Sequence, residues 1–147
     1  MRSKSIAGLV AALLLLAACA GPEPARPDLP IDFTARPWGA ADGFRQLVLG
    51  GHYDSAYDLL SAGLKKKYSR ALFEMEYRRM LETSLGRQEF ERRRVESERL
   101  DDETGWVMLR NPEQPASPPW IWRFVREGGQ WKLSEVESPP VILKADG

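Results

Sequence analysis

The apolar residues of this chain change their spacing near Gly86, and that change limits the folds open to it. Before Gly86 they recur at helical intervals, as in Phe73 and Tyr77. After Gly86 they alternate, as in Trp120 and Trp122, which is the period of a strand. Helices followed by strands predict an α+β fold with an antiparallel sheet.

Glycines and helix-capping residues divide the two halves into elements. The expected helices run from residue 40 to the Gly50-Gly51 pair, from Asp54 to residue 61, and from Ser69 to Gly86, with a basic turn at residues 64–68. The expected strands cover residues 90–100, 106–110, 120–126 and 131–136, with turns at residues 101–105 and 127–130. We therefore expect N-terminal helices packed on a curved antiparallel sheet of about four strands.

The N-terminus reads as an export signal. Arg2 and Lys4 precede an apolar run over residues 6–18, and the run ends in Leu-Ala-Ala-Cys at residues 16–19. A transmembrane helix is the first alternative, but these 13 residues are fewer than the roughly 20 that a bilayer requires. An ordinary signal peptide with a coincidental cysteine is the second.

Leu16 to Cys19 resembles the bacterial lipobox. The resemblance implies that residues 1–18 are removed, that Cys19 is acylated, and that membrane lipid holds the protein through that cysteine. Several acyl chains anchor a protein firmly, whereas one binds only marginally. Ala20 stands where an aspartate would mark inner-membrane retention, so we expect the cell envelope, at the outer membrane facing the periplasm.

The segment after Cys19 is rich in proline. Five prolines fall between Gly21 and Pro37, and few apolar residues accompany them, which predicts an extended tether over residues 19–37. We expect one α+β domain over residues 38–138 and a C-terminal tail over residues 139–147. The alternative, that the tether packs on the domain, concerns mainly Ile31, Phe33 and Trp38.

Composition excludes many classes of site. Cys19 is the only cysteine and His52 the only histidine, and no phosphate-binding loop or metal-binding motif occurs, so we expect no cofactor or metal. The basic run at residues 92–94 is flanked by glutamates and predicts a solvated strand face, not a nucleic-acid site. Without residues 1–18 the chain keeps 19 of its 21 basic residues against 21 acidic ones, a net charge of about −2.

Two stretches carry a resemblance to a known superfamily. Residues 51–61, Gly-His-Tyr-Asp-Ser-Ala-Tyr-Asp-Leu-Leu-Ser, follow a helix at Phe44–Leu49, and residues 124–133 end in a Gly-Gly turn and Trp131-Lys132-Leu133. This order resembles the nuclear transport factor 2-like superfamily, in particular small bacterial lipoproteins of unknown function. The resemblance implies a cone in which helices wrap a curved sheet, with room for a pocket.

The superfamily also contains ketosteroid-isomerase-like and cyclase-like enzymes, which need a carboxylate base inside the cone and hydroxyl donors. Glu135 is the nearest candidate for the base, and Tyr57, Tyr68 and Tyr77 are candidate donors. His52 falls in a turn between helices and is expected at the surface. We expect Asp54 to cap a helix and Asp58 to face solvent, so neither carboxylate requires a catalytic role. We therefore favour binding over catalysis.

Aromatic residues mark the candidate pocket or interface. Trp120 and Trp122 share one strand face, whereas Ile121 and Val125 lie on the other, so the sheet is apolar on both faces. Helices cover one face, and a partner protein or second copy, an apolar small molecule or the chain's own tail covers the other. The accessory subunit of an envelope assembly complex is a further alternative. The candidate residues are Tyr57, Tyr77, Trp106, Trp120, Trp122 and Trp131.

Overall fold

The computed structural model describes residues 21–22, 24–30 and 32–145, so the predicted signal peptide and Cys19 lie outside the described residues. A short 3-10 helix, η1 (Phe33–Ala35), precedes the helices α1 (Pro37–Leu49), α2 (Tyr53–Asp58), α3 (Ala62–Lys67), α4 (Arg70–Glu82) and α5 (Ser84–Arg92). The strands are β1 (Arg94–Leu100), β2 (Thr104–Arg110), β3 (Trp120–Glu127), β4 (Gln130–Ser138) and β5 (Val141–Lys144).

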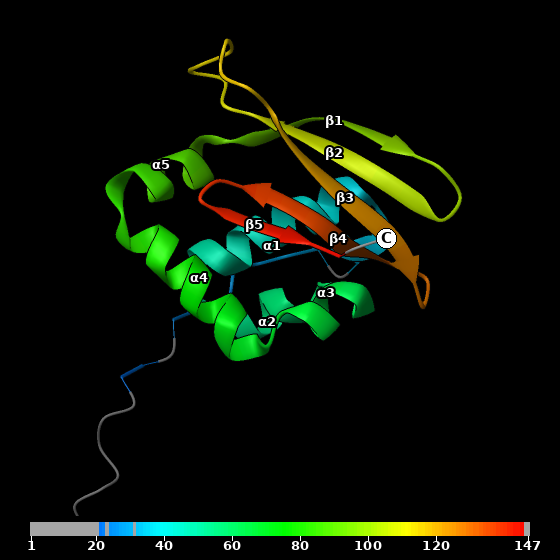
Figure 1. The fold of residues 1–147 in the computed structure, drawn as a ribbon, viewed down its shortest axis with the longest axis horizontal. Helices are drawn as coiled ribbons and strands as arrows, with labels where there is room; N and C mark the ends of the chain where they lie inside the picture. Colours follow the sequence, from blue (N-terminus) through cyan, green and yellow to red (C-terminus); the bar gives the residue numbers. More distant parts are fainter. Residues whose placement is uncertain (1–20, 23, 31, 146–147) are drawn as a thin grey trace, which may run out of the picture.

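The strands form one antiparallel sheet in chain order, and the helices gather on one of its faces (Figure 1). The predicted α+β class is confirmed. The sheet has five strands where about four were expected. We call the helix-covered side of the sheet its inner face and the other side its outer face.

Side-chain caps set where several helices begin. Ser69 accepts a hydrogen bond from the backbone N–H of Leu72 at 3.2 Å, which confirms it as the cap of α4. Ser61 caps α3 in the same way, so the expected basic turn at residues 64–68 is mostly helix. Asp54 lies in the first turn of α2 instead of capping it, because that helix begins directly after His52.

Gly86 does not end the helical half of the chain as the sequence suggested. Thr83 accepts a hydrogen bond from the Gly86 N–H at 3.1 Å and starts α5, which continues to Arg92. A Cβ on residue 86 would lie 2.4 Å from the Met80 carbonyl oxygen. The glycine therefore permits the tight corner between α4 and α5, and Phe90 is buried on a helix, not on a strand.

The predicted C-terminal tail contains the fifth strand. Val141 pairs with Ser138, and Leu143 pairs with Val136 on β4. Val141 and Leu143 are buried on the inner face, whereas Ile142 between them is 49% exposed. The described part of the tail, which ends at Ala145, therefore extends the sheet at its edge and does not cover the outer face.

The β3–β4 hairpin turns on two glycines. Gly128 has a φ of 58° and Gly129 a φ of 79°. Positive φ at both central residues is the geometry of a two-residue turn that matches strand twist, and glycine adopts it without steric cost. This turn fixes the register that brings Phe124 opposite Leu133.

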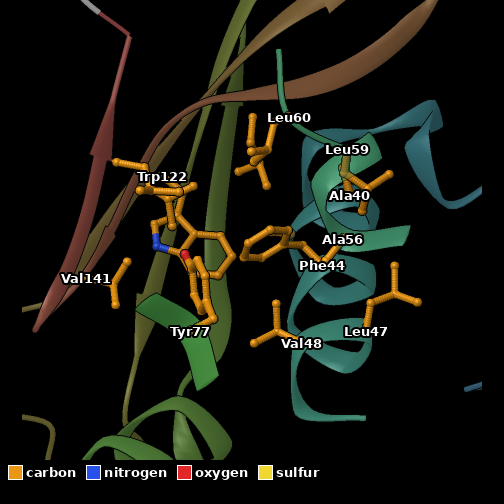
Figure 2. Close-up of a cluster of buried hydrophobic side chains, with 14 of the residues drawn as sticks. Ala40, Phe44, Leu47, Val48, Ala56, Leu59, Leu60, Tyr77, Trp122 and Val141 are labelled. Atoms are coloured by element: carbon orange, nitrogen blue, oxygen red, sulfur yellow. The ribbon is translucent and has the colours of Figure 1, made fainter. Parts of the chain in front are cut away.

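Aromatic rings fill the space between the helices and the inner face (Figure 2). Phe44 on α1 is in edge contact with Tyr77 at 5.6 Å and with Trp122 at 5.5 Å between ring centroids. Phe73 and Phe90 continue the cluster on either side. Edge-to-face pairs of this kind add stability beyond the area that they bury.

Part of the predicted tether packs on the domain. Leu29 and Phe33 lie against the core, and Thr34 is buried. His52, expected at the surface, is 6% exposed, and its Nε2 lies 3.1 Å from the carbonyl oxygen of Ala25. Between residues 21 and 145, apart from the two undescribed positions, no helix is long and apolar enough to cross a membrane.

Candidate functional site

Five of the six candidate aromatic residues lie in the core. Tyr77 and Trp122 are fully buried, and Tyr57, Trp120 and Trp131 are nearly so. The Tyr57 hydroxyl donates a hydrogen bond to the Tyr68 carbonyl oxygen at 2.7 Å, and its ring lies 4.6 Å from the Arg70 guanidinium. These positions are structural, because packed rings occupy the interior in which the cone pocket was expected.

Burial affects the one tyrosine hydroxyl at the centre of this core. Desolvation raises the pKa of Tyr77, and the neighbouring Ser138 hydroxyl opposes that rise. Tyr77 therefore remains neutral at physiological pH. Its ring contacts with Phe73 and Phe90 make it part of the packing.

Trp122 marks the point at which β3 and β4 separate. The ladder between these strands ends at Arg123–Glu135, although β3 starts at Trp120 and β4 continues to Ser138. Beyond that pair, the indole N–H of Trp122 donates to the Glu137 carbonyl oxygen at 2.8 Å. Figure 1 shows the β4–β5 hairpin diverging from β3 away from the Gly128–Gly129 turn.

An open groove of about 660 Å³ lies at the diverging end of the strands. One wall is residues 118–120 before and within β3, a second is residues 137–140 around the β4–β5 turn, and α5 forms the third. We call it the β3–β4 groove. Trp120, one of the candidate residues, lines it, and so do four prolines and Leu85, which is 70% exposed.

Arg93 joins the walls of this groove. It is 4% exposed, and its guanidinium donates to the Pro118 carbonyl oxygen and to Glu89, each at 3.0 Å. The same group lies 4.2 Å from the centre of the Trp120 ring. The expectation of a solvated basic run at residues 92–94 is therefore wrong for Arg93, because a buried cation needs such partners.

A second buried arginine, Arg45 on α1, was missed by the sequence interpretation. Its guanidinium donates to the backbone carbonyls of Phe90 and Glu91 near the end of α5, and to Asp42. Burial lowers the pKa of Arg45, and the Asp42 carboxylate opposes that change. The sequence of α1 does not predict that Arg45 is buried, because arginine is common on exposed helix faces.

The outer face of the sheet combines apolar and charged side chains. Trp106, Met108, Ile121 and Val125 are half-buried there. One residue from each of the five strands lies in a row across this face. Within the row, Glu135 pairs with Arg123 on β3 and with Lys144 on β5. The row consists of Arg99, Trp106, Arg123, Glu135 and Lys144.

The outer face also contains a hollow of about 580 Å³ beside Trp106 and Arg123. Glu135, the nearest candidate for an enzymatic base, lies on this face and not inside the fold. Asp54 and Asp58 both pair with Arg70, at 3.1 and 2.9 Å. Asp54 and Asp58 thus lie around the same Arg70 as the Tyr57 ring, whereas Glu135 is not brought together with the candidate tyrosines.

No group of three or more histidine, cysteine, aspartate or glutamate side chains is arranged to hold a metal ion in the part of the chain that the structure describes. The β3–β4 groove and the outer face are two surface features that combine apolar and charged side chains.

Within its described residues the chain is an α+β protein with five α-helices on one face of a five-stranded antiparallel sheet. Comparison with known protein families, with curated proteins and with solved structures finds no match for it.

Proposed function

We propose that the chain is a lipid-anchored bacterial envelope protein whose domain binds a partner and performs no catalysis. The observation that carries this proposal is the outer face of the sheet. Trp106, Met108 and Ile121 lie there half-buried, while the helices pack on the opposite face. A sheet with apolar residues on both faces is typical of a sheet that is covered twice.

The anchor is proposed from Leu16 to Cys19, with the acylated Cys19 in the outer membrane and the domain in the periplasm. The first described contact of the N-terminal segment with the domain is at Ala25. Ala25 lies six positions after Cys19 in the sequence, and an extended chain of that length spans at most about 20 Å. The domain is thus held close to the bilayer.

Replacing the lipid-bearing thiol tests the anchor. Cys19→Ser removes the acceptor, so we expect loss of palmitate labelling and accumulation of unprocessed precursor in cell membranes. Palmitate labelling that survives Cys19→Ser would contradict the proposed anchor.

The outer face supports a polypeptide partner, either another protein or a second copy of this chain. Arg99, Arg123 and Lys144 share a row there with the single carboxylate Glu135, so the row is basic. Complementary charge steers association and suppresses wrong partners. An acidic partner surface with an apolar centre fits this face best.

The interior argues for binding over an isomerase-like reaction. The Phe44 ring contacts those of Tyr77 and Trp122 where a substrate would lie, and Glu135 pairs with Arg123 on the outer face. We also propose that the fold is the cone variant of the nuclear transport factor 2-like superfamily. Irregular pairing between Val95 and Ser97, and between Arg123 and Phe124, supports the curvature that a cone needs.

Site-specific photocrosslinking tests the proposed use of the outer face. p-Benzoylphenylalanine replaces Ile121 on that face, or Met75, which is 54% exposed on α4. We expect a crosslinked protein of discrete mass from position 121 in growing cells and none from position 75. Equal adducts at the two positions, or none at either, would contradict the proposed binding surface.

A further inference from the structure

We propose that the side of the domain formed by α1 and the N-terminal segment rests on the bilayer that holds Cys19, with the Trp38 indole at the level of the lipid headgroups. This inference rests on the lipid anchor of the proposed function and goes beyond it, because an anchor alone leaves the orientation of the domain open. The orientation keeps the outer face of the sheet free for the proposed partner.

The N-terminal segment runs antiparallel along α1. Phe33 packs on the first turns of this helix, and the carbonyl oxygen of Ala25 reaches His52, just beyond the end of the helix. We call residues 25–30 and 32–36 the strap. The strap therefore follows one side of α1 over the length of the helix.

The chain that leads to the anchor starts from this side. At most about 20 Å of extended chain joins Cys19 to Ala25, which is also about the length of the 13-residue helix α1. The strap side can therefore lie flat on the bilayer while the anchor is inserted. A second contact with the same bilayer is intramolecular, so even a weak contact suffices to orient the domain.

Trp38 supplies that contact. It is 51% exposed at the start of α1, the largest exposed fraction among the five tryptophans. Its backbone N–H donates to Glu98 at 3.0 Å, whereas its indole N–H has no hydrogen-bond partner among the described residues. Tryptophan favours the membrane–water interface because its ring is apolar and its N–H can bond to headgroups.

The surface around Trp38 is electrically balanced. An open groove of about 420 Å³ lies between the strap and α1, and Pro30, Ala35 and Trp38 line it. Asp42 also lines this groove and pairs with Arg45 at 2.9 Å. The strap carries two cations and two anions, which are Arg26, Arg36, Asp28 and Asp32. The contact should therefore depend on the indole and not on anionic lipid.

Quenching of tryptophan fluorescence by brominated lipid tests this inference. The full lipidated chain is reconstituted in phosphatidylcholine vesicles, with and without phosphatidylglycerol, whose acyl chains are either ordinary or brominated near the headgroup. Bromine quenches only the tryptophans that contact lipid. Trp38→Phe removes the proposed contact, and Trp106→Phe on the outer face is the matched control.

We expect brominated lipid to lower the fluorescence of the native chain and of Trp106→Phe. Trp38→Phe should lose about half or more of this quenching, because the indole at the headgroups is absent. Omitting phosphatidylglycerol should leave the quenching of the native chain unchanged. Circular dichroism checks that both variants keep the native fold.

Equal quenching in Trp38→Phe and the native chain, or quenching in neither, would overturn the bilayer contact. The lipid anchor is judged separately, by palmitate labelling of Cys19, so the two failures are distinguishable. Quenching that disappears in Trp106→Phe would place the outer face on the bilayer and overturn the orientation. Quenching that requires phosphatidylglycerol would overturn the indole as the source of the contact.

Discussion

The backbone carbonyl of Phe33 lies against Gly39 of α1, so closely that a Cβ on residue 39 would come within 2.4 Å of the carbonyl oxygen. One turn later, a Cβ on Gly43 would lie 2.5 Å from Cδ2 of the Phe33 ring. The two glycines form a notch that receives the end of the N-terminal segment. Residues 33–36 are therefore part of the domain, and the free tether is correspondingly shorter.

The notch leads to a prediction about two alanine substitutions. Gly39→Ala meets a backbone atom, which cannot move alone, whereas Gly43→Ala meets a ring that can rotate away. Gly39→Ala should therefore release residues 33–36 and raise their amide hydrogen exchange at least about tenfold, with a smaller rise for Gly43→Ala. Equal exchange in Gly39→Ala and the native chain would contradict this packing.

Trp131 provides a prediction about the core. It is 5% exposed on the inner face, so Trp131→Ala should lower the free energy of unfolding by about 3–5 kcal/mol. Trp38 is 51% exposed on α1, and Trp38→Ala should cost less than about 1 kcal/mol. Urea denaturation measures both. Similar losses for the two variants would place Trp131 outside the core.

Arg92 and Arg93 are sequence neighbours with different environments. Arg93→Ala leaves the Pro118 carbonyl and Glu89 without their buried donor, so it should cost about 3 kcal/mol. Arg92 pairs at 2.9 Å with Glu113, but both side chains are largely exposed, and Arg92→Ala should cost less than about 1 kcal/mol. Thermal unfolding of the two variants checks the difference. A destabilisation by Arg92→Ala as large as that by Arg93→Ala would contradict it.

Tyr77 gives a pH dependence. Burial raises its pKa above the ordinary value near 10, so at high pH the folded chain keeps a proton that the unfolded chain loses. The stabilising contribution is complete below about pH 10 and declines as pH rises above it. Between pH 8 and 11, the native chain should lose more unfolding free energy than Tyr77→Phe. Parallel pH profiles for the two proteins would show that Tyr77 does not titrate as described.

The spacing of apolar residues in the sequence predicted the buried faces of individual helices and strands. The spacing of Phe73, Tyr77 and Met80 gave the buried face of α4, and alternation at Trp120 and Trp122 gave the inner face of β3. The prediction that Gly86 ends the helical half was wrong, because Thr83 caps a new helix, α5, that includes Gly86. A glycine in such a corner resembles a helix stop in sequence.

The candidate site was less predictable than the fold. Arg93 is buried by carbonyl groups that lie 16 and 25 residues further along the chain, so no short pattern marks it. The β3–β4 groove depends on where a ladder ends, which is a property of strand register and not of either strand alone. The sequence did name Trp120 as a candidate, because a large aromatic residue on a strand face belongs either to the core or to a binding surface.

Native mass spectrometry of residues 20–147, exported on a signal peptide that leaves no lipid, tests the proposed binding function most directly. This span keeps the packing of Phe33 on α1. We expect the domain to carry a second polypeptide, either a partner or another copy, which is lost in Trp106→Asp and retained in Trp38→Asp. A bare monomer, or a small molecule that remains bound in Trp106→Asp, would contradict the account.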